Sequence, residues 1–339
     1  MIWFWIGFIL FILILLALDL GVFNKEAHII SIREAFVWTF VWICISMLFN
    51  VFIYYAYEHH WLGIGKNISE PMSGIEAATK YFTGYLVEKS LSLDNIFVIA
   101  LIFGYFKIPQ RFQHRVLFWG ILGALVMRGI MIIAGTALIH KFEWMIVVFG
   151  VLLILTALKM LFSKEGDFDP NKNFLLKASR KLYPVSDELH ENKFFVHLNG
   201  KKTATPLFLV LIVVESSDLL FALDSIPAIF AITTDSFLVF TSNVFAILGL
   251  RSLYFALAAV INKFRFLKVS LVFILIFVGI KMILTHQEYH VSTMASLSVI
   301  IGFLSFGIIG SLLFPLKGET HSKVLYEGDI SATTPTKEN

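Results

Sequence analysis

The chain has 339 residues, of which 58% are hydrophobic and 15% are charged, and its formal net charge is +3 at pH 7. Soluble proteins carry roughly 25% charged residues, so the composition excludes an ordinary soluble enzyme, a disordered chain and a nucleic-acid-binding protein. The single cysteine, Cys44, excludes an intrachain disulfide and a metal site made of several cysteines. The sequence therefore predicts a protein that resides in a lipid bilayer.

Nine apolar segments follow one another along the chain, and each is long enough to cross about 30 Å of hydrocarbon as a helix. Backbone groups in lipid must bond internally, and the alternation typical of a membrane barrel strand is missing, so we predict helices. The fold class is therefore expected to be all-α and polytopic. The expected spans are residues 2–23, 36–57, 81–104, 116–139, 144–162, 206–232, 237–260, 267–285 and 294–314.

The basic residues of the connections are distributed unevenly. If the N-terminus lies outside, the inner connections hold 19 of the 27 Lys and Arg residues and the outer connections hold 3. Cytoplasmic loops are enriched in Lys and Arg, so we predict an outside N-terminus and a cytoplasmic C-terminus. Residues 1–316 would then form one transmembrane domain with a cytoplasmic loop at 163–205. The polar tail, 317–339, is expected to be a disordered cytoplasmic segment.

Charged residues also occur inside the predicted spans. A charge at the bilayer centre costs roughly 2.5–3.5 kcal/mol on insertion scales, so these groups should face one another or a wet cavity. Ion pairs without a ligand would explain an isolated charge, but buried pairs are weak stability devices, and the acids are concentrated on two spans. The charged residues are Asp19, Glu88, Asp94, Glu215, Asp218, Asp224, Lys89, Arg128, Lys159, Arg251 and Lys281.

The third to fifth spans (81–162) and the sixth to eighth spans (206–285) carry similar charged residues in the same order. An odd number of helices per repeat inverts the second copy in the membrane, as in many secondary transporters, whose binding site lies at the repeat interface. We therefore predict an inverted three-helix repeat. The matching segments are VEKS at 87–90 with VESS at 214–217, LDNI at 93–96 with LDSI at 223–226, Arg128 with Arg251, and Lys159 with Lys281.

The ligands available at this interface are carboxylates, Asn95, Ser225 and backbone carbonyls. Such an all-oxygen set suits Mg²⁺, Ca²⁺ or Mn²⁺, and all ten His residues lie outside the spans, which argues against a zinc or copper site. Pro227 frees the carbonyl of Leu223, so we expect a broken sixth span that turns this carbonyl and Asp224 toward one ligand. The residues expected to neutralise or hold the carboxylates are Arg128, Arg251, Lys159 and Lys281.

Asp94 and Asp224 are the predicted core of the site, because each is the Asp of its repeat's L-D-[NS]-I motif. Two carboxylates without a cation repel, so one should hold a proton that metal entry would expel. The G-x-x-x-x-G-K-[ST] motif of ATP-driven proteins is absent from the sequence. Proton exchange is therefore the expected source of work.

These motifs resemble the TerC family of bacterial membrane proteins, in particular its Alx-like members. The segments that carry the resemblance are 17–23, 88–97, 215–228 and 243–253. The resemblance implies export of Mn²⁺ across the bacterial inner membrane and a historical association with tellurite resistance. Ca²⁺ and Mg²⁺ are alternative substrates, and no resident cofactor is expected. The implied metal-binding residues are Asp19, Glu88, Asp94, Asn95, Glu215, Asp218 and Asp224, with Arg128, Arg251, Lys159, Lys281, Ser225 and Pro227 in supporting roles.

Two other functions stay open. One is an intramembrane hydrolase in which a carboxylate-held metal activates water, although the sequence contains neither a G-x-G-D nor an H-E-x-x-H motif. The other is an interaction protein that assists membrane or secreted enzymes through charged docking pairs. We favour a transporter without enzymatic activity. Its expected partners are a divalent metal ion, the lipid bilayer, and either a second copy of the chain or another membrane protein, but not nucleic acid.

Overall fold

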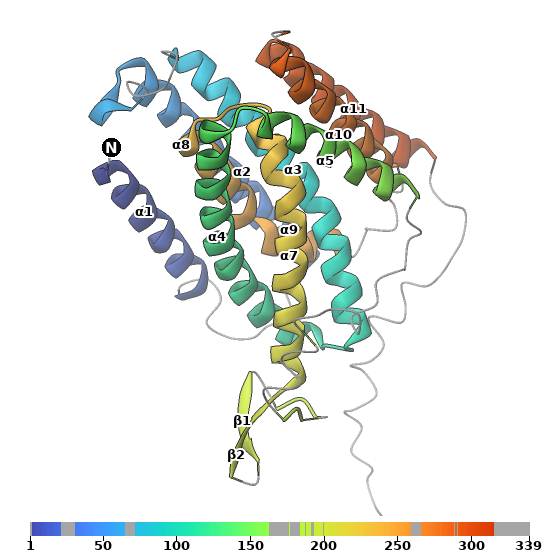
Figure 1. The fold of residues 1–339 in the computed structure, drawn as a ribbon. Coiled ribbons are helices and arrows are strands. Elements are labelled where there is room, and N and C mark those ends of the chain that lie inside the picture. Colours follow the sequence, from blue (N-terminus) through green and yellow to red (C-terminus); the bar gives the residue numbers. More distant parts are fainter. Residues whose placement is uncertain are drawn as a thin grey trace, which may run out of the picture.

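The computed structural model describes residues 2–21, 31–64, 72–162, 176, 184–186, 188–190, 193–198, 200–258, 266–287, 289 and 291–314. The predicted tail, 317–339, lies outside the described residues. Figure 1 shows that helices dominate the structure. In chain order the elements are α1 (Ile2–Gly21), α2 (Ile32–Glu58), the short 3₁₀ helix η1 (Trp61–Gly63), α3 (Gly74–Tyr105), α4 (Gln110–Lys141), α5 (Met145–Phe162), β1 (Phe195–Leu198), β2 (Lys201–Ala204), α7 (Pro206–Phe230), α8 (Ser236–Leu248), α9 (Leu250–Ala258), α10 (Leu267–His286) and α11 (Thr293–Leu313).

Six of the described helices are long and apolar enough to cross a membrane, namely α2, α4, α5, α7, α10 and α11, and α8 with α9 forms a seventh if the bent pair is one span. The prediction of a mostly helical multi-pass chain is therefore confirmed. Nine crossings stay a prediction. Helix α3 is continuous, but Glu88, Lys89 and Asp94 interrupt its apolar sequence. The described apolar part of α1 covers only Trp5–Leu18.

The seventh predicted span, 237–260, is broken in the structure. Helix α8 ends at Leu248, α9 begins at Leu250, and the two are bent by 42°. Gly249 lies at the break, and glycine is among the weakest helix formers. The site also requires a small residue, because a Cβ at Gly249 would lie 2.9 Å from Nζ of Lys89 and 3.1 Å from Cβ of Trp42.

The prediction of a break in the sixth span was wrong. Helix α7 runs without interruption from Pro206 to Phe230 and contains Pro227 in its last turn. A proline removes one backbone hydrogen bond and crowds the preceding turn. Here the helix ends three residues after Pro227, and the helical conformation continues through Asp224.

The charged helices form one group. Helix α3 packs against α7 and α8, and α4 packs against the same two helices. In Figure 1, α3, α4 and α7 run along the long direction of the molecule. A second group, α5, α10 and α11, packs on α7 and α3. Glu88 of α3 and Arg128 of α4 therefore lie inside the bundle, whereas Arg111 of α4 is exposed.

Helices α5 and α10 meet through two glycines. A Cβ at Gly150 would lie 2.8 Å from the carbonyl oxygen of Gly279, and a Cβ at Gly279 would lie 2.7 Å from that of Gly150. Leu153 and Met282, each three residues after its own glycine, contact the opposite glycine in the same way. The contact is thus reciprocal, with two backbones in direct contact, as small residues permit between membrane helices.

An antiparallel hairpin, β1 with β2, departs from the predicted all-α fold. It pairs Phe195 with Ala204 and Leu198 with Lys201, and it immediately precedes α7. Figure 1 shows it projecting beyond the start of α7, away from the helices. Gly200, in the connecting turn, has φ +75°, which glycine adopts without strain.

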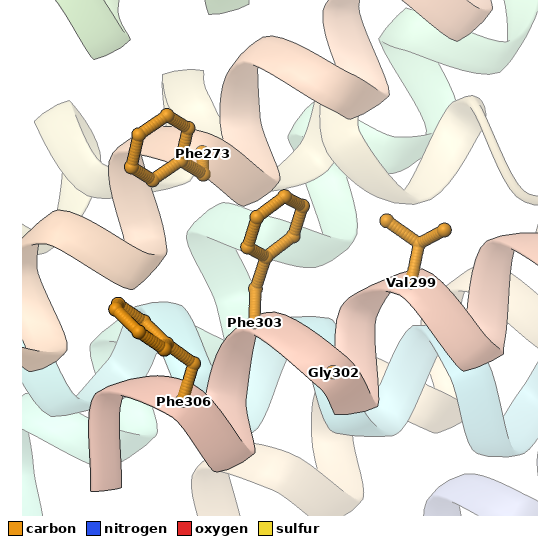
Figure 2. A pocket seen from close by; sticks show the side chains of 5 residues that line it. All are labelled: Phe273, Val299, Gly302, Phe303 and Phe306. Carbon is orange, nitrogen blue, oxygen red and sulfur yellow. The ribbon is translucent and has the colours of Figure 1, made fainter. Parts of the chain in front are cut away.

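An apolar groove of about 520 Å³ lies between α10 and α11. Figure 2 shows Val299, Phe303 and Phe306 on one helix and Phe273 on the other. The rings of Phe273 and Phe303 stack, with centroids 5.5 Å apart and planes 9° apart. The residues that line the groove carry no polar side chain, so the groove is not a candidate for binding a cation.

Candidate functional site

Glu88 and Arg128 form a buried ion pair at the centre of the charged helices. Glu88 on α3 is 0% exposed and Arg128 on α4 is 2% exposed. Nη1 of Arg128 donates to Oε1 of Glu88. A charge of either kind is expensive to bury alone, and the pair with its hydrogen bond offsets much of that cost.

Arg128 also contacts the two remaining helices of the group. Its Nη1 donates to Oγ of Ser225 on α7 and to Oδ1 of Asn243 on α8, each at 3.1 Å. Its Nη2 donates to Oδ1 of Asp218 on α7 at 3.4 Å. One guanidinium therefore joins α3, α4, α7 and α8. Two carboxylates share one cation, which leaves a formal charge of −1 on this cluster.

Several oxygens of the cluster are buried without a hydrogen-bond partner among the described residues. They are Oε2 of Glu88, Oδ2 of Asp218 and Oγ of Ser92, one helical turn after Glu88. A buried polar atom left unsatisfied costs about 1–3 kcal/mol, and most such atoms in native proteins are bonded to protein or water. The cluster thus offers hard oxygen ligands that the described side chains do not satisfy.

Glu215 lies beside this cluster. It precedes Asp218 by three residues, which places both carboxylates on one face of α7. The carboxylate of Glu215 packs directly against Gly123 of α4, at the position that a Cβ there would occupy. The absence of a side chain at Gly123 therefore makes room for the carboxylate.

Asp224 faces a different helix. Its Oδ1 accepts a hydrogen bond of 2.8 Å from Oγ1 of Thr156 on α5, and Lys159 on the same helix interacts with it electrostatically. Asp218 and Asp224 are six residues apart, about 240° around a helix with 3.6 residues per turn. Their side chains therefore have different partners, Arg128 for one and α5 for the other.

The predicted ligands do not assemble into one cluster. Within the described part of the chain, no three His, Cys, Asp or Glu side chains lie close enough to hold one metal ion. Asn95 is buried, Asp94 is partly exposed, and the side chain of Asp19 lies outside the described residues. The seven-residue ligand set stays a prediction. Within it, Glu88 and Asp218 share Arg128, and Glu215 interacts electrostatically with Asp218.

Of the other predicted supporting residues, Ser225 accepts from Arg128, whereas Arg251 and Lys281 interact with other groups. Arg251 on α9 is 4% exposed, and its Nη1 donates to Nε2 of His114 on α4 at 2.8 Å. Lys281 on α10 is 7% exposed, and the charged group that acts on it is Lys80 of α3. Their expected support of the carboxylates stays a prediction.

Three polar contacts were not predicted. Asn243 accepts a hydrogen bond from Arg128, and Thr156 donates one to Asp224. In the third contact, Nζ of Lys89 donates to the carbonyl oxygen of Ala246 at 3.1 Å. A polar side chain in an apolar run signals such a partner, but the sequence does not say which residue the partner is.

Comparisons with known proteins give a consistent result. The family model described as "Integral membrane protein TerC family" matches residues 73–318. An "Uncharacterized membrane protein STKORF319" of Myxococcus xanthus is 46% identical over 309 residues, which cover 91% of this chain and 92% of the relative. A "Putative membrane-bound redox modulator Alx" of Escherichia coli K12 is 44% identical over 302 residues, which cover 88% and 91%. No solved structure matches this chain.

Proposed function

Because this chain belongs to the TerC family of integral membrane proteins, we propose that it is a secondary transporter that exports a divalent metal cation, with Mn²⁺ as the substrate. The proposal includes exchange for protons, no enzymatic activity, and a location in the bacterial inner membrane. It places the N-terminus outside and the C-terminus in the cytoplasm. The choice of Mn²⁺ rests on the family resemblance, since oxygen ligands also suit Ca²⁺ and Mg²⁺.

The carrying observation is that two carboxylates, the buried Glu88 and the partly buried Asp218, share Arg128. Glu88 and Asp218 come from two helices, retain a net negative charge, and each has one oxygen without a partner among the described residues. Ionisable groups inside a membrane are expensive and typically mark an ion pathway. A divalent cation would bind oxygens of this kind and compensate the excess negative charge.

The proposed inverted repeat has support in the packing of the helices. Exchanging α3 with α7 and α4 with α8 converts the α3–α8 contact into the α7–α4 contact, and both are extensive. The remaining pair, α5 and α10, meets through the reciprocal contact of Gly150 and Gly279. Such an exchange is what a two-fold axis in the membrane plane would produce.

The name of the Alx relatives raises redox modulation as an alternative. A dithiol–disulfide couple needs two thiols, and this sequence has only Cys44. Cys44 is exposed on α2 and is not part of the charged cluster. The single thiol therefore favours the transporter over thiol-based redox chemistry within one chain.

A flux measurement on purified protein tests the proposal. Liposomes loaded with a fluorescent chelator should report Mn²⁺ entry that depends on the protein and is accompanied by counter-movement of protons. Glu88→Gln and Asp218→Asn should abolish the flux, whereas Glu143→Gln, at an exposed position after α4, should not. No protein-dependent flux of Mn²⁺, Ca²⁺ or Mg²⁺ would refute the proposal.

A further inference from the structure

The break between α8 and α9 ends a helix inside the protein. Residues 244–248, the last turn of α8, are all buried. The last four carbonyl groups of a helix have no partner within the helix, and together they carry a partial negative charge. In α8 the carbonyl of Ile247 accepts from the N–H of Gly249. Buried carbonyls of this kind need a donor or a cation.

Lys89 supplies the cation. Its Nζ donates to the carbonyl oxygen of Ala246 at 3.1 Å, and it lies so close to Gly249 that a Cβ there would come within 2.9 Å of it. The broken helix thus holds an ammonium group at its end, and the ammonium reaches it from α3.

The residue just before this turn of α8, Asn243, contacts the carboxylate cluster. Asn243, one turn before Ala246, accepts from Arg128, and Lys89 directly follows Glu88, the partner of Arg128. The end of α8 is therefore next to the proposed path of the cation.

We propose that the carboxyl-terminal end of α8 is a second binding position for a divalent cation, which Lys89 occupies when the metal is absent. The proposal rests on the proposed function, because it assumes a divalent cation as substrate. Carbonyl oxygens at the ends of broken helices coordinate cations in transporters. The lysine side chain is a point charge on a flexible stem, so the ammonium can leave the carbonyl when a metal arrives.

Equilibrium binding of Mn²⁺ to purified protein in detergent, measured by calorimetry, tests the position. Lys89→Met removes the ammonium and should lower the dissociation constant about tenfold, equivalent to about 1.4 kcal/mol. Gly249→Ala keeps the charge, but its added Cβ pushes the ammonium off the carbonyl, so it should also tighten binding. Lys80→Met removes the same charge from the same helix, away from the break, and should leave the dissociation constant within about twofold of wild type.

Equal effects of Lys89→Met and Lys80→Met, or unchanged binding by Lys89→Met, would overturn the second position. If Lys89→Met does not fold, as judged by its thermal transition, Gly249→Ala decides alone, and unchanged binding then overturns the proposal. Binding is measured without flux. Tighter binding by the Lys89 variant together with absent Mn²⁺ flux would therefore refute the transporter and leave the α8 position intact.

Discussion

Arg128 is the residue on which the charged cluster depends. It holds Glu88 and Asp218 by ion pairs and Ser225 and Asn243 by hydrogen bonds. A planar guanidinium presents five donors in a fixed arrangement, which a lysine does not reproduce. The four-helix group is therefore built around the shape of this side chain as well as its charge.

We predict that Arg128→Lys destabilises the protein by about 3–5 kcal/mol, because at least one carboxylate loses its partner and stays buried. The measurement is the thermal transition in detergent together with abundance in the membrane. Arg111→Lys, at an exposed position on α4, is the control and should change stability by less than about 0.5 kcal/mol. Wild-type stability of Arg128→Lys would show that the fork geometry is not needed.

The contact of Glu215 with Gly123 gives a second prediction at the level of single residues. An alanine there would place its Cβ on the carboxylate of Glu215, and overpacking of this kind costs about 1–3 kcal/mol. Gly123→Ala should lower the thermal transition and reduce Mn²⁺ flux, because Glu215 must move. Gly104→Ala, where a Cβ would meet nothing within 4 Å, should have neither effect. Equal thermal transitions and equal Mn²⁺ flux of the two variants would show that the position of Glu215 does not matter for transport.

Asp94 and Asp224 allow a prediction on the motif acids. Asparagine keeps the size and one oxygen ligand of each aspartate but removes its charge and its titration. Asp94→Asn and Asp224→Asn should each abolish protection of cells against excess Mn²⁺ at normal membrane abundance, since a neutral amide is cheaper to bury than an unpaired charge. Glu143→Gln serves as the control. Full protection by the double variant would defeat the paired-carboxylate mechanism.

At the level of helices, hydropathy predicted most positions because α2, α4, α5, α7, α10 and α11 each contain an apolar stretch of 18 residues with at most two charged residues. Breaks were not predictable from local chemistry. Pro227 leaves α7 intact because the helix ends three residues later, whereas the span 237–260 is broken at Gly249, a weak helix former at a position where Lys89 and Trp42 leave no room for a Cβ. Each outcome depends on the surroundings of the residue as well as on the residue itself.

The charged residues of the candidate site could be selected from the sequence because each is costly in lipid. Their partners could not be, since a partner depends on how each helix is rotated in the bundle. Asp218 and Asp224 share one helix, yet one contacts Arg128 and the other Thr156. Arg128 and Arg251 occupy matching positions in the sequence, yet Arg128 donates to Glu88 and Asp218 whereas Arg251 donates to His114, a difference that the sequence does not reveal.

The contact of α5 with α10 gives a prediction at this scale. Gly150→Ala and Gly279→Ala would each bring a methyl group within 2.8 Å of a backbone oxygen, so each should cost about 1–3 kcal/mol of stability. Gly302→Ala on α11, which has open space around it, should be neutral or slightly stabilising. The stabilities of the three variants are compared by unfolding in detergent. Unchanged stability of Gly150→Ala would show that α5 and α10 can move apart without a cost in stability.

For the molecule as a whole, the distribution of Lys and Arg predicts which side of the membrane each connection faces. Reporter fusions at Ile64, after α2, and at His190, before α7, should report the outside and the cytoplasm respectively, because the segment 163–205 carries many Lys and Arg residues. Alkaline phosphatase and a fluorescent protein, active on opposite sides of the membrane, give the readout. The same side for both positions would contradict the nine-span arrangement.

The shared guanidinium has a consequence for how the protein is made. Glu88 enters the membrane machinery before its partner exists, since Arg128 follows 40 residues later and Asp218 a further 90 residues after that. At a synthesis rate of about 5–20 residues per second, the carboxylate waits roughly 2–8 seconds for its cation. We therefore expect α3 to spend this interval in the insertion channel or at the aqueous interface and to enter lipid together with α4. The expected biogenesis is a concerted release of helices rather than their insertion one at a time.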